Sequence, residues 1–372
     1  MKNSSIIGII AVTAALAALA GCNKIEGVKG SGDGAEDTAD YSCELTVALD
    51  GAAAPSTKVA SQTESNEKTI QNVQVFVFRA GNGADQGKLD VSASVGFDTP
   101  LGLSTGEFYD PSKLKIKCST GEREIYVVVN DAVDHTRDAG IRTKAQFLAL
   151  TTQLKDNTPS KLFMIGSIAV TLVEGTQKVT VPVKRVCAAV ILEGVTNAFV
   201  SPAYQGDNVF RVGNCYLMNV PGKINFGLTT EPSTLEDSDW YGRLAAETES
   251  PQKDLIFDAV TAKVVNYTQT DNTSHTFYAY PNNCAFSEDL TWSRRATVLV
   301  VEAEINDGDG WMKYYYPVAI KDGLQSNKQY RINLSVNRPG SLNPNWTVRF
   351  SDLEPDIVVS DWEEGTPYSP SI

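Results

Sequence analysis

The sequence predicts a mainly β protein built from two antiparallel β-sandwich domains with a few short helices. The chain contains many short runs rich in Val, Ile, Phe and Tyr, separated by turns with Gly and Pro, and only one clearly helical stretch. Such strand-upon-strand patterns are typical of sandwiches. Two domains of roughly 100 to 200 residues fit the length, and 42% hydrophobic residues are enough to fill two cores.

Residues 1–21 have the pattern of a lipoprotein signal peptide. An apolar run over 6–19 follows a basic residue and leads to Ala20, Gly21 and Cys22. The run is shorter than the roughly 20 apolar residues of a membrane-spanning helix, so we expect its removal. The Cys22 thiol would then accept a diacylglyceryl group, with acyl chains such as palmitate, and anchor the chain in outer-membrane lipid. A plain signal peptide with an accidental cysteine is the alternative.

The mature chain begins with alternating polar and strand-like segments. Residues 23–40 are rich in Gly, Asp, Glu, Lys and Ser, which predicts a disordered tether. A short strand follows, and its alternate apolar residues share one face: Cys43, Leu45, Val47 and Leu49. Residues 50–68 are polar again, so we expect an exposed, protease-accessible loop.

The rest of the chain is a series of predicted strands. They cover residues 70–78, 114–118, 124–130, 168–172, 179–192, 210–220, 276–280, 296–305, 314–320, 330–336, 346–350 and 357–362. Helical spacing predicts a helix between Thr143 and Leu154, and a second short one is expected within 234–249. The domain boundary is placed near Lys184 and Arg185, which gives sandwiches over 59–185 and 186–372.

Composition and motifs argue against a nucleic-acid-binding protein or an enzyme. A formal charge of −13 argues against nucleic-acid binding, which depends on basic patches that displace phosphate counterions. The two histidines, His135 and His275, belong to no HExxH or related motif, so we expect no catalytic residue, metal or cofactor. The run 306–310 resembles a calcium loop, but Trp311 replaces a needed ligand position and Asp-Gly favours a hairpin turn.

Five cysteines follow Cys22, and none forms a close CxxC pair that would indicate a zinc or thioredoxin-type site. Export permits disulfides without requiring them, and buried free cysteines are an equally good interpretation. The sequence leaves the pairing open among Cys43, Cys118, Cys187, Cys215 and Cys284.

The order of these segments resembles that of the bacteroidal major fimbrial subunits, the FimA- and Mfa-like fimbrillins of type V pili. No single segment is specific, but their order and spacing together are. The resemblance is carried by the lipobox at 19–22, the runs 73–78, 125–130, 163–167, 181–192 and 327–336, and the terminal Ser360-Asp361-Trp362.

The resemblance implies two transthyretin-like sandwiches and a structural subunit, here assigned to the stalk, of an adhesive fimbria on the cell surface. In this family a trypsin-like surface protease removes the first strand of an outer-membrane lipoprotein, here within a propeptide over 22–58. The open groove then takes a strand from another subunit. The implied partners are further copies of the chain, anchor and tip proteins, and the protease.

The position of the cleavage site departs from the family. Familiar fimbrillins are cut after an arginine, whereas residues 50–68 contain none, and their basic residues are Lys58 and Lys68. Lys58 is preferred because it follows Pro55-Ser56-Thr57 in the least structured part of the loop, and Lys68 is the alternative. If both are ordinary solubilising charges, the first strand is retained, as in an anchor or accessory subunit.

The donor strand is expected near the C-terminus, within about 345–362. Alternate apolar residues with the same period of two occur there: Trp346, Val348, Phe350, Ile357 and Val359. Donor-strand complementation pairs the backbone of a sheet edge and buries alternate side chains. A strand lost and a strand gained with similar patterns can therefore fill one groove.

A monomeric surface glycan-binding lipoprotein at the outer membrane is the main alternative. It would use aromatic residues as a sugar-stacking platform: Trp311, Tyr314, Tyr315 and Tyr316. The same residues also fit a strand packed on one face. A glycosidase ranks third, because the carboxylate constellation is missing.

Overall fold

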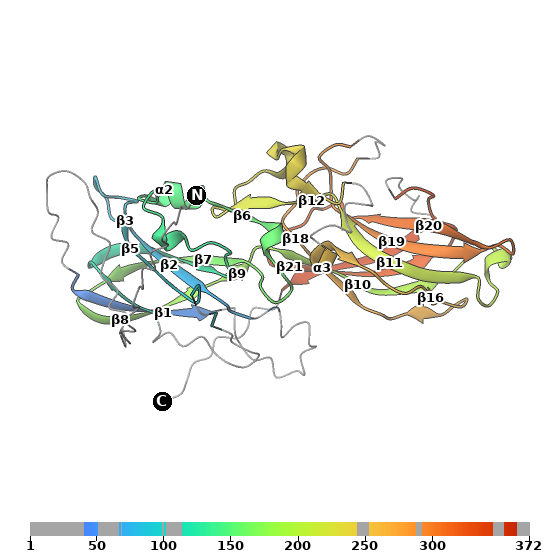
Figure 1. Ribbon diagram of the computed structural model, residues 1–372, viewed down its shortest axis with the longest axis horizontal. Helices are drawn as coiled ribbons and strands as arrows, with labels where there is room; N and C mark the ends of the chain where they lie inside the picture. Colours follow the sequence, from blue (N-terminus) through green and yellow to red (C-terminus); the bar gives the residue numbers. More distant parts are fainter. Residues whose placement is uncertain are drawn as a thin grey trace, which may run out of the picture. The chain divides into compact units, whose positions relative to one another are not determined.

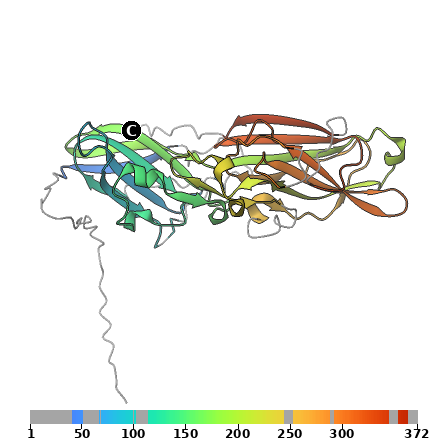
Figure 2. The same cartoon turned by 90° about the horizontal axis from the view of Figure 1, so that it is seen from above.

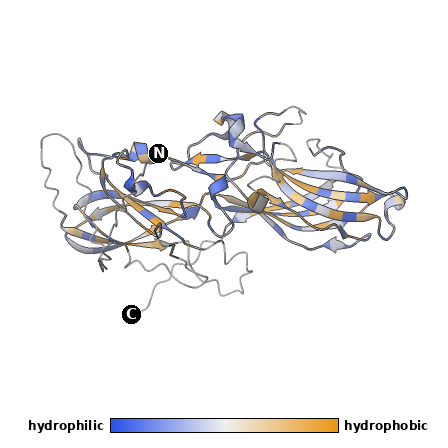
Figure 3. Ribbon diagram, viewed as in Figure 1, coloured by the Kyte–Doolittle hydropathy of each residue, from blue (hydrophilic) through white to orange (hydrophobic). Residues whose placement is uncertain are grey.

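The computed structural model describes residues 41–50, 67, 69–98, 100–101, 114–243, 253–287, 292–344 and 353–362. Its residues are mostly in strands with a few short helices, so the predicted fold class is confirmed. The strands form two groups of sheets, blue to green for the first and yellow-green to red for the second (Figures 1 and 2). Apolar residues concentrate on the strands (Figure 3).

The first group contains a five-stranded and a three-stranded sheet. The five-stranded sheet has the order β3 (Leu89–Val95), β2 (Val73–Arg79), β5 (Gly121–Val129), β7 (Met164–Leu172) and β9 (Lys184–Arg185). The three-stranded sheet has the order β4 (Lys115–Cys118), β1 (Cys43–Asp50) and β8 (Gly175–Pro182).

Both faces of the five-stranded sheet are covered, because strand β2 is buried along almost its whole length. Val75 and its alternates pack in one core with the side chains of β1, β4 and β8. Phe76 and Phe78 point to the other face, where Phe147 of the short helix α2 (Lys144–Leu148) lies 4.6 Å from Phe76 between ring centroids.

The second group contains two five-stranded sheets that share one core. One has the order β17 (Thr270–Asp271), β10 (Ala188–Asn197), β21 (Lys328–Val336) and β22 (Leu353–Asp361), with β18 (His275–Ala279) also paired to β10. The other has the order β15 (Phe257–Asp258), β11 (Phe210–Met218), β19 (Val298–Asn306) and β20 (Trp311–Ala319), with β16 (Lys263–Val264) also paired to β11.

Short elements connect these sheets. Two-stranded pairs join β12 (Val220–Pro221) to β14 (Trp240–Tyr241) and β13 (Lys223–Asn225) to β6 (Thr151–Gln153). Single helical turns are η2 (His135–Arg137), η3 (Leu154–Asp156), η4 (Pro202–Tyr204), η5 (Pro232–Thr234), η6 (Asp237–Asp239) and α3 (Lys253–Ile256).

Several details differ from the sequence-based expectation. The predicted helix over 143–154 ends at Leu148 and is followed by β6. The described part of 234–249 holds the last residue of the turn η5, the turn η6 and the strand β14. The run 179–192 divides among β8, β9 and β10. Strand β3 was not predicted, because four of its residues are polar or Ala and most are only half-buried. The pairs β1–β8 and β10–β21 are parallel, so both of their sheets are mixed.

Gly166 in β7 allows the connection between β8 and β9 to pass close to the sheet. A Cβ at this position would lie 1.8 Å from the carbonyl oxygen of Pro182. We expect Gly166→Ala to lower the free energy of unfolding by about 1–3 kcal/mol, because backbone must move to relieve the overlap. Chemical denaturation measures this loss. Gly213→Ala is the control, since its Cβ would lie 3.6 Å from the nearest atom, the carbonyl oxygen of Glu302, and equal losses in both variants would contradict the argument.

Candidate functional site

Strand β1 is the central strand of the three-stranded sheet. It pairs antiparallel with β4, from Cys43 opposite Cys118 to Thr46 opposite Lys115, and parallel with β8 over its whole length. Figure 1 shows it in blue beside β8. Because neighbouring strands lie about 4.8 Å apart, β4 and β8 are separated by roughly 9–10 Å and β1 fills a slot one strand wide.

The side chains of β1 contribute directly to the core of the first group. Cys43, Leu45 and Val47 are at most 1% exposed, and Leu49 is half-buried against the same core. The intervening Glu44 faces outward, where it pairs with Lys115 at 3.4 Å. A segment joined to the rest of the chain only through residues after Asp50 therefore supplies one part of a continuous hydrophobic core.

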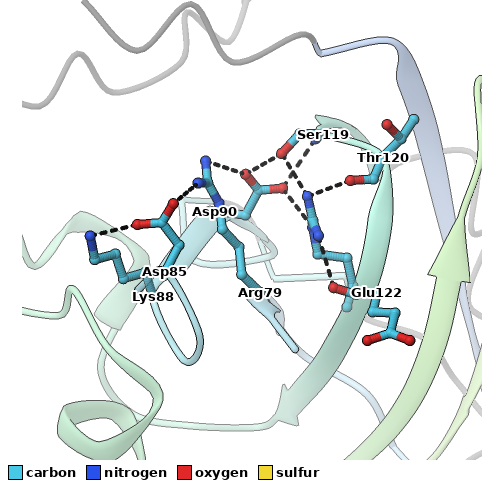
Figure 4. A network of polar contacts seen from close by, with 8 residues as sticks. Arg79, Asp85, Lys88, Asp90, Ser119, Thr120 and Glu122 are labelled. Atoms are coloured by element: carbon cyan, nitrogen blue, oxygen red, sulfur yellow. Dashed lines mark hydrogen bonds and ion pairs between the residues drawn. The ribbon is translucent and has the colours of Figure 1, made fainter. Parts of the chain in front are cut away.

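A buried polar network fixes the turn that follows β4 (Figure 4). The Asp90 carboxylate, whose side chain is 1% exposed, accepts hydrogen bonds from the Ser119 backbone N–H at 3.1 Å and hydroxyl at 2.6 Å. It also pairs with Arg123 at 3.2 Å and with Arg79 at 3.6 Å. Arg123 in turn donates to the Thr120 carbonyl at 2.7 Å. One wall of the slot is thus attached to the five-stranded sheet by contacts that do not involve β1.

The C-terminal strand β22 lies at the edge of its sheet and pairs with β21, from Lys328 opposite Asp361 to Val336 opposite Leu353. Its described side chains bury little surface: Ile357 is half-buried against the core, while Val358 and Val359 are each 52% exposed. Asp361 forms an ion pair with Lys328, and this hydrogen bond lowers the pKa of the Asp361 carboxyl. The strand is therefore held mainly by its backbone hydrogen bonds.

Immediately after β22, Trp362 enters a buried polar site, named here the Glu67 cluster and made of Glu67, Arg185, Tyr278 and Trp362. The Glu67 carboxylate accepts hydrogen bonds from the Tyr278 hydroxyl at 2.5 Å and from the Trp362 indole N–H at 3.2 Å. The Tyr278 and Trp362 rings are stacked, with centroids 6.0 Å apart.

Arg185 completes the Glu67 cluster. Its guanidinium lies 4.7 Å from the Trp362 ring centroid and donates two hydrogen bonds of 3.2 Å to the Glu67 backbone carbonyl. Burial lowers the pKa of Arg185 and the negative charge of Glu67 opposes this change, while burial raises the pKa of Tyr278. The cluster therefore joins Glu67, near the end of the predicted loop over 50–68, to the end of the C-terminal strand. The prediction that this whole loop is exposed is wrong at Glu67, which is buried because its carboxylate accepts hydrogen bonds from Tyr278 and Trp362.

Six of the residues singled out from the sequence lie outside the described residues: Cys22, Lys58, Lys68, Trp346, Val348 and Phe350. Lipidation, cleavage and the first half of the donor segment stay predictions. Sequence reasoning missed the Glu67 cluster and the Asp90 network, because the charged residues at the centre of each look like ordinary surface charges until distant strands bring their partners together.

The described part of the chain contains no group of three His, Cys, Asp or Glu side chains placed to bind a metal ion, and none of its helices is long and apolar enough to cross a bilayer. His275 lies against Asp258, with 2.7 Å between Nδ1 and the carboxylate. Residues 306–311 close the β19–β20 hairpin, as the Asp-Gly sequence predicts.

The aromatic residues of β20 do not form one platform. Successive side chains of a strand point to opposite faces, so Trp311 and Tyr315 lie on one face and Tyr314 and Tyr316 on the other. Tyr316 is buried, and Trp311 is covered by the guanidinium of Arg211, whose central carbon lies 4.1 Å from the ring centroid. This arrangement fits a packed strand better than a sugar-stacking surface.

Comparisons with known proteins agree with the architecture. Residues 43–207 match the sequence family described as the major fimbrial subunit protein (FimA). No curated protein sequence is significantly similar to this chain.

Several solved structures share the fold at low sequence identity. A fimbrilin (FimA) from Porphyromonas gingivalis superposes with a TM-score of 0.56 and 16% identity, over 86% of this chain and 98% of that one. A Bacteroides eggerthii protein proposed to act in cell adhesion gives 0.57 and 19%, over 86% and 96%. The C-terminally truncated tip protein Mfa3 of P. gingivalis gives 0.52 and 12%, over 86% and 99%.

Proposed function

Because residues 43–207 belong to the FimA family of major fimbrial subunit proteins, we propose that this chain is a stalk subunit of a cell-surface fimbria and polymerises by donor-strand exchange. The observation that carries the proposal is the position of β1 between β4 and β8. Removal of this one strand leaves a slot with an unpaired backbone edge on both sides and an open hydrophobic core. A strand of another subunit can fill both.

The energy of the exchange is sufficient to hold a subunit contact. Removal of β1 empties the core positions of four apolar side chains: Cys43, Leu45, Val47 and Leu49. At roughly 1.5 to 3 kcal/mol for each buried side chain, a donor that replaces them recovers on the order of 10 kcal/mol in addition to the backbone hydrogen bonds. The free subunit with an empty slot is unstable by the same amount, which favours rapid capture of a donor.

Strand β22 is the described part of the proposed donor. An edge strand that buries little side-chain surface detaches at lower cost than a central strand, and its apolar Ile357 and Val359 have the spacing of the β1 residues that they would replace. A subunit that both gives and receives a strand extends a filament. These two properties support the stalk assignment over that of a tip.

The Glu67 cluster supports Lys58 as the cleavage site over Lys68. Cleavage after Lys68 would remove Glu67, and with it the carbonyl that accepts the hydrogen bonds of the buried Arg185 and the carboxylate charge near it, whereas cleavage after Lys58 keeps the cluster intact. N-terminal sequencing of purified filaments is expected to begin at Val59. A first residue at Cys22 or a blocked N-terminus in polymerised material would refute both the site and the removal of β1.

The precursor is proposed to be lipidated at Cys22 and carried to the outer membrane. We expect Cys22→Ala to abolish incorporation of labelled fatty acid and to leave the chain unprocessed and off the surface. Metabolic labelling and cell fractionation measure both effects. Labelled lipid in the variant would place the anchor elsewhere.

The polymer itself is tested by gel migration of surface material with and without boiling. A ladder that collapses to the subunit mass on heating is expected, because many backbone hydrogen bonds and buried side chains must separate together. A single band at the subunit mass before heating would overturn the proposal and favour the monomeric glycan-binding lipoprotein.

A further inference from the structure

Cys43 and Cys118 face each other across the boundary of the slot. They are direct partners in the antiparallel ladder between β1 and β4, and both side chains are buried. Directly opposite residues of such a ladder have Cα atoms about 4.5–5.5 Å apart, which lies within the roughly 4.4–6.8 Å range of disulfide-bonded cysteines. The two thiols are also close enough to interact, since Cys43 contributes after burial to raising the pKa of Cys118 to about 12.

The other three cysteines lack this arrangement. Cys215 lies opposite Asp258 and Val301 in its ladders, and Cys187 and Cys284 are outside the strands that the structure describes. None of them has a cysteine opposite it in the registers of the described strands. Among the described strands, a pair of facing cysteines therefore occurs only between the removable strand β1 and its neighbour β4.

We propose that Cys43 and Cys118 form a disulfide bond in the exported protein and thereby tie β1 covalently to β4. The structure has both residues as thiols, so the step is an oxidation. The two thiols lose two protons and two electrons and gain one S–S bond. A disulfide of a thiol-oxidising protein, or oxidised glutathione, takes up the electrons and becomes two thiols.

Burial determines when the bond forms. The thiolate is the reactive species, and burial disfavours it at Cys118, so oxidation is slow once β1 is in place. The bond is expected to form during folding, when the strands are paired but still accessible. Once formed and buried, it is protected from reductants by the same packing.

The consequence rests on the proposed function. After cleavage at Lys58 the excised peptide over 22–58 would stay attached to the subunit through Cys118, and with it the acyl anchor at Cys22. The slot would open only after two electrons and two protons are returned to the bond by a dithiol reductant. Release of β1 would thus require reduction as well as proteolysis.

The bond is tested on the full chain recovered from an oxidising periplasm, denatured without reductant and alkylated with N-ethylmaleimide. Three of the five cysteines from Cys43 to Cys284 are expected to react, and a linked Cys43–Cys118 peptide should appear by mass spectrometry. Cys118→Ala should make Cys43 reactive. Cys215→Ala, a buried cysteine without a facing cysteine, should keep the linked peptide.

The same samples show what the bond does. After cleavage with a lysine-specific protease, the β1 fragment should stay with the parent subunit in denaturant and be released by dithiothreitol, while the Cys118→Ala subunit should lose it in denaturant alone. Reaction of all five thiols in the periplasmic parent, or a link between other cysteines, would overturn the inference and leave the proposed function standing. A Cys43–Cys118 bond in subunits that never polymerise, even when cleaved and reduced, would instead overturn the proposed function.

Discussion

A subunit carrying Val359→Asp is expected to fold and to be exported like the parent, yet to stop filament growth. In the free subunit Val359 is 52% exposed, so a carboxylate there should change the free energy of unfolding by less than about 0.5 kcal/mol. In the slot the same side chain would point to the core that Leu45 and Val47 fill. An unpaired carboxylate in that core costs several kcal/mol, and each 1.4 kcal/mol lowers the exchange equilibrium about tenfold.

Val358→Asp is a closely matched control. Val358 is also 52% exposed in the free subunit, precedes Val359 in the same strand and would point to solvent after exchange, because successive strand residues face opposite ways. This variant should polymerise like the parent. Thermal denaturation of each free variant measures its stability. Unheated gels of each variant mixed with cleaved parent subunits measure how far it polymerises. Ladders of equal length for the two variants would exclude β22 from the slot.

The local sequence pattern was sufficient to predict strands β1 and β2. Strand β1 has alternating apolar residues and strand β2 is rich in Val and Phe. Both patterns can be read from a few consecutive residues, so both strands could be predicted. Strand β3 was not predicted, because its polar residues Asp90 and Ser94 bond to Ser119 after β4 and to Asp134 before η2, partners that the local sequence does not indicate.

Helix α2 shows how a distant segment overrides local periodicity. The apolar spacing continues to Leu154, but the carbonyl oxygens of Leu148 and Leu150 accept hydrogen bonds from the backbone N–H groups of Gly227 and Phe226 at 3.0 and 2.8 Å. These hydrogen bonds continue the antiparallel pairing between β6 and β13. They use carbonyl oxygens that would accept intrahelical hydrogen bonds in a longer helix. The sequence pattern at 143–154 does not indicate that residues 226 and 227 will bind there, so it could not predict where the helix ends.

The candidate site was predictable in part for the same reason. Strand β1 could be placed by its own alternation, whereas the parallel partner β8 could not, because nothing in residues 175–182 specifies which strand they join. The Glu67 cluster unites residues almost three hundred positions apart in the sequence. Glu67 on its own has the appearance of one more solubilising charge in a polar loop.

Glu67→Ala is expected to have the largest effect on stability. The substitution removes the acceptor of the Tyr278 hydroxyl and the Trp362 indole N–H and leaves the buried Arg185 without the carboxylate charge beside it. Each buried donor left without an acceptor costs about 1–3 kcal/mol, so the loss for the two donors is expected to be about 2–6 kcal/mol. Chemical denaturation of the full chain measures the loss.

Glu193→Ala provides the control, because it removes a hydrogen-bonded carboxylate at an exposed position. Glu193 pairs with Arg331 of β21 at 2.7 Å, but both side chains are more than one-third exposed, so the loss should stay below about 1 kcal/mol. A similar loss in both variants would show that the Glu67 cluster gains nothing from burial.

The same pair of variants separates global stability from the attachment of β22. Since Trp362 directly follows β22, its release in Glu67→Ala should let this edge strand open more often, while the ladder between β21 and β10 stays closed. Hydrogen exchange of the β22 amides should therefore quicken in Glu67→Ala far more than in Glu193→Ala, under conditions where both variants remain folded. If exchange in β22 is unchanged while the free energy of unfolding falls, the cluster stabilises the fold without holding the proposed donor strand. Detachment of β22 would then be limited by its backbone ladder to β21 alone.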